Sequence, residues 1–157
     1  MTNYRQVSDE TKKLFYEVVD NTAIPQWVEV KIVADDTLVN KDGYLVRKQN
    51  DLSEWLTDGL HVVVIINEDI FDGLEETDVQ MKFFEEALGG VVADNEKVKV
   101  KVNKPDFATH SGFLEKHGAD DVLLLKLAIQ SLYEQRKLKE DEEKAQAKLD
   151  AKATRTK

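Results

Sequence analysis

The stretch from His61 to Gly90 constrains the fold more than any other part of this chain. Residues 62–66 are consecutive β-branched or aliphatic side chains, which is typical of a strand buried on both faces. Residues 75–88 then carry apolar side chains at helical spacing, and two glycines follow where the helix would end. Between them, residues 68–73 are expected to form a loop whose two apolar side chains, Ile70 and Phe71, are buried. We therefore expect a buried strand and an amphipathic helix that packs against it.

Shorter patterns on either side of this pair predict an α+β domain with a mixed sheet of about four strands packed with helices. Alternation of apolar and polar residues predicts strands at 27–33 and 98–102, and a short strand is expected at 44–47. Helices are expected to begin after Ser8 and again near Asp120.

The last part of the chain differs from the rest because its apolar stripe stops after Tyr133. The following residues are mostly charged residues, alanine and glutamine, with opposite charges often three or four positions apart, which favours a helix. We expect a single domain over residues 1–135 and a charged helical extension over residues 136–157. With no apolar face to bury, this extension should become a flexible tail near Lys152.

The charge of the chain narrows the classes of ligand that it can bind. It contains 31 acidic and 22 basic residues, and its net charge is -9. Because nucleic-acid phosphates repel such a chain, we expect no direct nucleic acid binding. Its longest apolar run is far too short to cross a bilayer, and its first residues lack the apolar segment of a signal peptide. We therefore expect an intracellular protein that does not bind membranes.

Residues that could carry hydrolytic chemistry are sparse. The chain has no cysteine, which excludes thiol nucleophiles and thiolate metal sites. It also lacks the His-Glu-x-x-His sequence that places two zinc ligands and a general base on one helix face. The histidines, His61, His110 and His117, are scattered, and only His110 is placed where a third zinc ligand could lie.

Three segments resemble the phage metallopeptidase family. They read IINEDIFDGL at residues 65–74, VVADNE at 91–96 and PDFATHSGFLEKHG at 105–118. In that family a hydrophobic strand ends in a similar Ile-Asn sequence, and the next helix carries His-Glu-x-x-His. The similarity extends over residues 27–118. It implies a small zincin-like α+β domain of phage origin, located in the host cytoplasm.

The diagnostic motif of that family is missing at the positions where the resemblance places it. In one register the two histidines of the motif fall at Glu86 and Gly90, and the general base falls at Ala87. In a register shifted by one residue, the ligand positions fall at Glu85 and Gly89. Zinc is expected for the family, but the imidazole ligands are missing in both registers. The resemblance therefore implies the fold without a cofactor and without hydrolysis.

Three functions remain open. The first is a catalytically inactive, phage-encoded protein that binds a host or phage protein, for example as an acidic inhibitor of a host protein. The acids that would form its binding surface are Glu68, Asp69, Asp72, Glu75, Glu76 and Asp78. The second is an active hydrolase that holds Mg²⁺ or Mn²⁺ with His110 and nearby carboxylates. The third is a structural or assembly protein that docks through its C-terminal helix.

Overall fold

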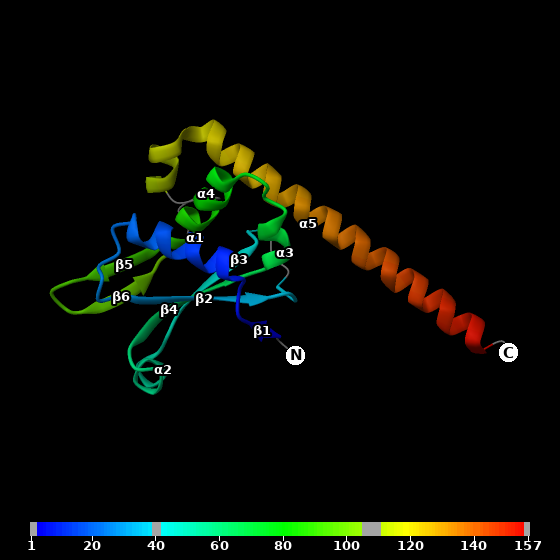
Figure 1. The fold of residues 1–157 in the computed structure, drawn as a ribbon, viewed down its shortest axis with the longest axis horizontal. Helices are drawn as coiled ribbons and strands as arrows, with labels where there is room; N and C mark the ends of the chain where they lie inside the picture. Colours follow the sequence, from blue (N-terminus) through cyan, green and yellow to red (C-terminus); the bar gives the residue numbers. More distant parts are fainter. Residues whose placement is uncertain (1–2, 39–41, 105–110, 156–157) are drawn as a thin grey trace.

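The computed structural model describes residues 3–38, 42–104 and 111–155. They form an α+β fold in which a mixed four-stranded sheet is packed with helices and the last helix projects outward (Figure 1). The strands are β1 (Tyr4–Arg5), β2 (Glu29–Asp35), β3 (Tyr44–Lys48), β4 (Leu60–Ile66), β5 (Val91–Asp94) and β6 (Lys99–Val102). The helices are α1 (Asp9–Asp20), α2 (Asp51–Leu56), α3 (Glu68–Asp72), α4 (Thr77–Leu88) and α5 (Ser111–Arg155). The predicted α+β class and the mixed four-stranded sheet are thereby confirmed.

β4 is a central strand of the larger sheet, as its run of aliphatic residues predicts. The strand order is β1-β2-β4-β3, with β4 parallel to β2 and antiparallel to β3. Val62, Val64 and Ile66 of β4 are completely buried. Val30 and Ile32 of β2 pair with the first two of these residues, so both strands contribute to one apolar face. β5 and β6 form a separate antiparallel hairpin.

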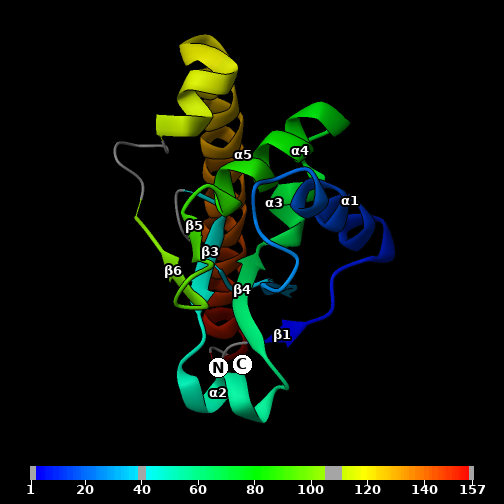
Figure 2. The same cartoon turned by 90° about the vertical axis from the view of Figure 1, so that its left-hand side faces the viewer.

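α1 and α4 pack together over the sheet (Figures 1 and 2). α4 is the helix expected at 75–88, and it starts two residues later. Its Phe83 packs edge-on against Tyr44 of β3, with 5.6 Å between the ring centroids. Its Phe84 packs edge-on against Phe15 of α1 at 5.2 Å. α4 therefore joins the sheet to α1 through adjacent aromatic rings.

The short helix α3 occupies a segment where a loop is expected, so that expectation is wrong. The side-chain oxygen of Asn67 caps α3 by accepting hydrogen bonds from the backbone N–H groups of Asp69 (3.1 Å) and Ile70 (3.4 Å). A helix of barely more than one turn is too short to show a periodic apolar pattern, which is why pattern reasoning misses it. Ile70 and Phe71 are buried, as expected for the two apolar side chains of this segment.

α5 extends to Arg155 with a break at Gly118, just before the helix that is expected to begin near Asp120. Gly118 has φ 79° and ψ 162°, a conformation that side chains rarely allow. α5 then crosses the core, where Ile129 is completely buried. Beyond Arg136 nearly every described residue is exposed, and the helix continues past Lys152. Among the described residues, no helix combines the length and hydropathy needed to cross a membrane.

Candidate functional site

The C-terminal half of α4, where the resemblance places a metal site, is covered by α5. Glu86 is completely buried and forms an ion pair with Lys126 of α5. Ala87 is 2% exposed and has no donor atom. Gly90, which follows the helix, has no side chain. The degenerate motif positions are therefore used for packing and for one buried ion pair.

These residues do not fit the zinc ion of the metallopeptidase family. Such a site needs two imidazoles on one helix face, whereas the Glu86 carboxylate already neutralises the Lys126 ammonium. In the described part of the chain, no group of three or more histidine and carboxylate side chains could hold a metal ion. His110, the candidate third ligand, lies outside the described residues. The donor set on α4 therefore offers no place for a metal-bound water.

Glu85, the residue before the buried pair, joins α4 to the first turns of α5. Lys116 Nζ donates to one oxygen of its carboxylate, and His117 Nε2 lies 2.6 Å from the other. Burial raises the pKa of Glu85, but hydrogen bonds from Lys116 and His117 outweigh this effect, so the pKa is lowered overall. The His117 ring also packs against Phe113, at 4.7 Å between centroids. These contacts hold both ring and carboxylate in place.

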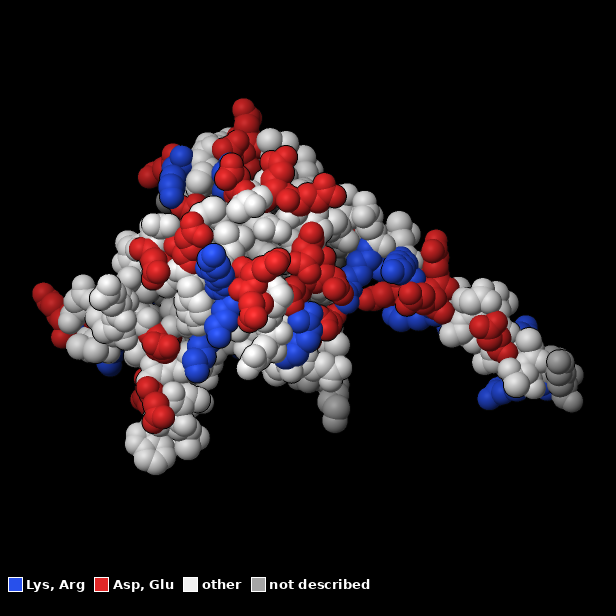
Figure 3. All heavy atoms as spheres, in the orientation of Figure 1, with Lys and Arg blue, Asp and Glu red and all other residues white. Residues whose placement is uncertain are grey.

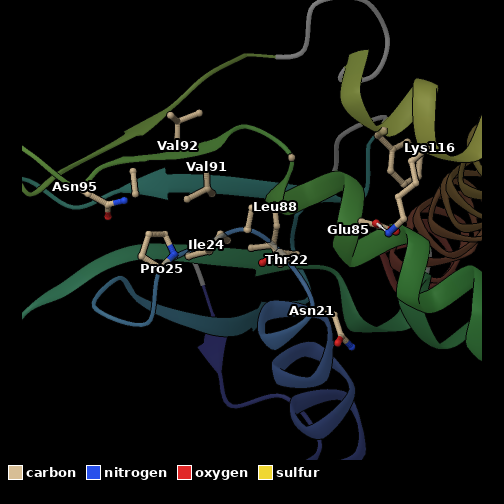
Figure 4. Close-up of a pocket in the computed structure, with 14 residues that line it drawn as sticks. Asn21, Thr22, Ile24, Pro25, Glu85, Leu88, Val91, Val92, Asn95 and Lys116 are labelled. Carbon is tan, nitrogen blue, oxygen red and sulfur yellow. Dashed lines mark hydrogen bonds and ion pairs between the residues drawn. The ribbon is translucent and has the colours of Figure 1, made fainter.

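A cleft of about 530 Å³ opens beside this ion cluster (Figure 4). Its walls come from the loop after α1, the end of α4, β5 and the start of α5. The apolar side chains among them include Ile24, Pro25, Leu88, Val91, Val92 and Phe113. Figure 4 shows Glu85 and Lys116 pointing toward each other at one end. The cleft therefore has the size of a small-molecule site, with its charge confined to one end.

The ion cluster beside the cleft contains one part of a hydrolytic site, the pair of Glu85 and His117. A histidine held by a carboxylate is the arrangement of a general acid or base. Hydrolysis also needs an activated nucleophile or a metal-bound water. Among the described lining residues, Thr22 has the only hydroxyl, and it donates its hydrogen to the Val19 carbonyl (2.7 Å). The described contacts of Glu85 therefore support a role in fixing the start of α5 on α4.

Sequence reasoning misses the contact between Glu85 and His117. It counts His117 among three scattered histidines, and it names Glu85 only as a ligand position in the shifted register of the motif. The two residues are 32 positions apart, and they meet only because α5 breaks at Gly118 and crosses the end of α4. His61 is also engaged, since its Nδ1 accepts a hydrogen bond from the backbone N–H of Glu29 (3.0 Å). Neither contact could be predicted from a sequence pattern.

No protein-family model, curated protein or solved structure matches this chain. The link to phage metallopeptidases therefore depends on the three sequence segments that carry the resemblance, and it stays a prediction.

The acids expected to bind a partner are not all on the surface. Glu68 is buried, where it accepts hydrogen bonds from Arg5 Nη1 (2.5 Å) and from the backbone N–H of Ser8 (2.8 Å). It ties the N-terminal segment to α3, so it is not available to a partner. Asp69 is exposed, but it forms an ion pair with Arg136 (3.2 Å).

Four of those acids are exposed and form no ion pair within the described part of the chain. With one exposed acid of α1 they make up the acidic face, which comprises Glu10, Asp72, Glu75, Glu76 and Asp78. Burial raises the pKa of Asp72; Glu68 and Asp69 raise it further by charge repulsion, Arg5 offsets part of this, and Glu10 adds to it. Figure 3 shows acidic side chains gathered over the start of α1 and over α3. Glu10 is missed from sequence because it is distant along the chain.

Asn67 fixes the direction in which α5 leaves the fold. Its side chain is completely buried, and its Oδ1 accepts a hydrogen bond from Arg136 Nη1 (2.7 Å). Its Nδ2 donates to the Leu38 carbonyl (3.1 Å), and Arg136 also donates to the Asp36 carbonyl. One amide thus connects the loop after β2, the start of α3 and the projecting helix.

Proposed function

We propose that this protein acts by binding a basic protein through its acidic face. In this proposal it is a zincin-like relative of the phage metallopeptidases that lacks hydrolytic activity, and its partner is a host protein. Binding would cover a basic surface of that partner, as an acidic inhibitor does. The proposal combines the sequence resemblance with the charge distribution around α3.

The exposed, unneutralised charge of the acidic face carries the proposal. Asp72, Glu75, Glu76 and Asp78 follow one another along a short segment, and α1 adds Glu10 beside them. The pKa of Asp72 is raised first by burial and then by charge repulsion from Glu68 and Asp69, so part of this increase reflects negative charges held close together. A basic surface would relieve this repulsion, and complementary charge would also speed and orient its approach.

The side chains of α4 support the second part of the proposal, the lack of hydrolysis. Glu86 is committed to Lys126, and neither Ala87 nor Gly90 can donate to a metal. Metal analysis of the purified protein before and after chelation tests this part. Zinc bound in a one-to-one ratio and resistant to the chelator would contradict it.

The binding itself is tested by reversing charge on the acidic face. The double variant Asp72→Lys/Glu76→Lys changes the charge by four units on exposed side chains that form no described ion pair. Glu17→Lys/Asp20→Lys is the matched control, because it makes the same change on the exposed surface at the other end of α1. Each protein is immobilised and used to capture proteins from a bacterial lysate at low salt.

We expect a basic protein to be retained by the native chain and by the control, and to be lost with Asp72→Lys/Glu76→Lys. Retention should also fail in about 1 M salt, where the screening length falls to about 3 Å. If all three chains retain the same proteins, the acidic face is not the binding surface. Retention that resists salt would also count against it.

A further inference from the structure

β5 has one edge that no other strand of the described chain covers. It pairs only with β6, and the two form a separate two-stranded sheet. The Asn103 N–H donates to the Gly90 carbonyl (2.7 Å), and in an antiparallel pair such bonds recur at every second residue. Val92, two residues after Gly90, therefore directs its backbone groups toward β6. The backbone N–H and carbonyl groups of Val91 and Ala93 point away from β6, toward the free edge.

The free edge of β5 is not protected against the addition of a strand. Within the described chain, the backbone groups of Val91 and Ala93 that face this edge have no hydrogen-bond partner. Both residues are half-buried. β6 carries Lys99 and Lys101, and lysines discourage strand addition, whereas residues 91–93 of β5 carry no charge. Unpaired backbone groups of this kind are a template for another strand.

The cleft beside Glu85 runs along this free edge. Residues of β5 line it and, among the described lining residues, none belongs to β6, so the cleft lies on the side of β5 away from β6. The opposite wall is the loop after α1, which includes Ile24 and Pro25. In Figure 4, Val91 points toward the side on which Ile24 and Leu88 lie. An occupant beside β5 would therefore meet unpaired backbone groups at the edge and apolar side chains below it.

Side-chain contacts hold the two walls of the cleft in place. At one end Lys116 donates to the Glu85 carboxylate. Near the hairpin turn, Trp27 Nε1 donates to Asn95 Oδ1 (2.8 Å), which ties the end of β5 to the segment that follows the loop. β5 comprises 4 residues, which is roughly 13 Å of extended chain. The edge therefore offers room for a single short strand.

We infer that this cleft binds an extended apolar peptide segment of another protein, which adds to the free edge of β5 as a third strand. In the antiparallel arrangement the peptide pairs with Val91 and Ala93, and every second side chain enters the cleft beside Ile24 and Leu88. A second copy of this chain does not fit, because its own β5 stands behind the same loop. The inference does not depend on the proposed basic partner, since no residue of the acidic face lines the cleft.

Amide hydrogen exchange followed by NMR tests the edge itself. In the free chain the Val91 and Ala93 amides should exchange at least about tenfold faster than the Val92 amide, which is bonded to β6. The peptide acetyl-Lys-Val-Thr-Val-Thr-Val-Lys-amide serves as the probe, because its apolar residues alternate as a strand requires. Its addition should slow exchange at Val91 and Ala93. Slow exchange of these two amides in the free chain would mean that the edge is already covered, and would overturn the inference.

Fluorescence anisotropy of the labelled peptide measures the binding. The full chain is titrated up to about 1 mM, and saturable binding is expected within that range. The same peptide with proline in place of its central valine lacks one N–H that faces β5, so it should bind at least about tenfold more weakly. Equal affinity of the two peptides would mean that backbone pairing is not involved. That result, or no binding of the first peptide up to about 1 mM, overturns the inference.

Two variants of one loop locate the peptide on the protein. Ala23 is exposed and lines the cleft opposite β5, so Ala23→Trp should obstruct the peptide and weaken binding by at least about tenfold. Gln26→Trp is the matched control, because Gln26 is exposed in the same loop and is not among the described lining residues. It should bind the peptide as the native chain does. Native affinity in Ala23→Trp, or equal weakening by both variants, would place the peptide elsewhere and overturn the inference.

Discussion

At the scale of single residues, the ion pair between Glu86 and Lys126 is the least expected feature of the core. Neither oxygen of the Glu86 carboxylate accepts a hydrogen bond within the described residues, so the ammonium is its main compensation. Nearby, burial raises the pKa of Tyr44, and the negative charges of Glu86 and Asp42 raise it further. A buried pair of this kind gives little net stability, yet losing one partner is costly.

Replacing Lys126 alone should therefore be costly. We expect Lys126→Met to lower the free energy of unfolding by about 3 kcal/mol, because the Glu86 carboxylate stays buried without its cation. Glu86→Leu combined with Lys126→Met should recover most of that loss. Urea denaturation measures both, and Lys82→Met, which removes the more exposed ion pair with Asp121, is the control with a small effect. If the single and double variants lose the same free energy of unfolding, the loss comes from altered packing and not from the unpaired charge of Glu86.

Glu85 makes the stability of the fold depend on pH. Its pKa is lowered below the ordinary value of 4.5 in the folded state, so its ionised form stabilises the fold above that pH. The contribution is lost as the pH falls through the lowered pKa. We expect Glu85→Gln to cost about 1 kcal/mol at neutral pH, and the native and variant melting temperatures to converge in acid.

Melting curves recorded between neutral pH and acid decide this point. Glu115→Gln is the control, because Glu115 is exposed and has no described ion pair. Its melting temperature should follow the native one throughout. A deficit for Glu85→Gln that is the same at every pH would mean that the carboxylate charge contributes nothing.

At the scale of elements, long patterns were predictable and single contacts were not. The aliphatic run of β4 and the apolar stripe of α4 are dictated by burial, so both could be read from local sequence. α3 could not, since it depends on one cap, and neither could the meeting of Glu85 with His117, which depends on how α5 crosses α4. Four acids of the acidic face were predicted from their clustering, and Glu10 was not, because it is distant along the chain. Glu68 belongs to the same cluster in the sequence, but it is buried beside Arg5.

Asn67 is the contact on which three elements depend at once. We expect Asn67→Ala to lower the free energy of unfolding by about 2–3 kcal/mol, because it removes the α3 cap and leaves Arg136 Nη1 and the Leu38 carbonyl without this partner. Asn67→Asp should cost less, since it keeps the acceptor and loses only the donor. Chemical denaturation of the three proteins gives the ranking. If the alanine variant is as stable as the aspartate variant, the cap does not contribute to the stability of the fold.

At the scale of the whole molecule, charge is separated along the chain. Residues 144–157 contain five cations and one anion, so the excess negative charge of the protein lies in the preceding part. The acidic face lies on that part, and α5 leads away from it (Figures 1 and 3).

The shape of the cleft depends on the backbone conformation of Gly118. Among the residues that the structure describes, no atom lies within 4 Å of where a side chain would begin at Gly118, so a methyl group would find room beside them. The backbone nevertheless adopts a shape that such a group disfavours. Any other residue at this position would favour a continuous helix. The start of α5 would then move, Lys116 and His117 would lose their contacts with Glu85, and the cavity would lose the wall that this segment forms. The shape of that cavity is thus governed by a residue that takes no part in lining it.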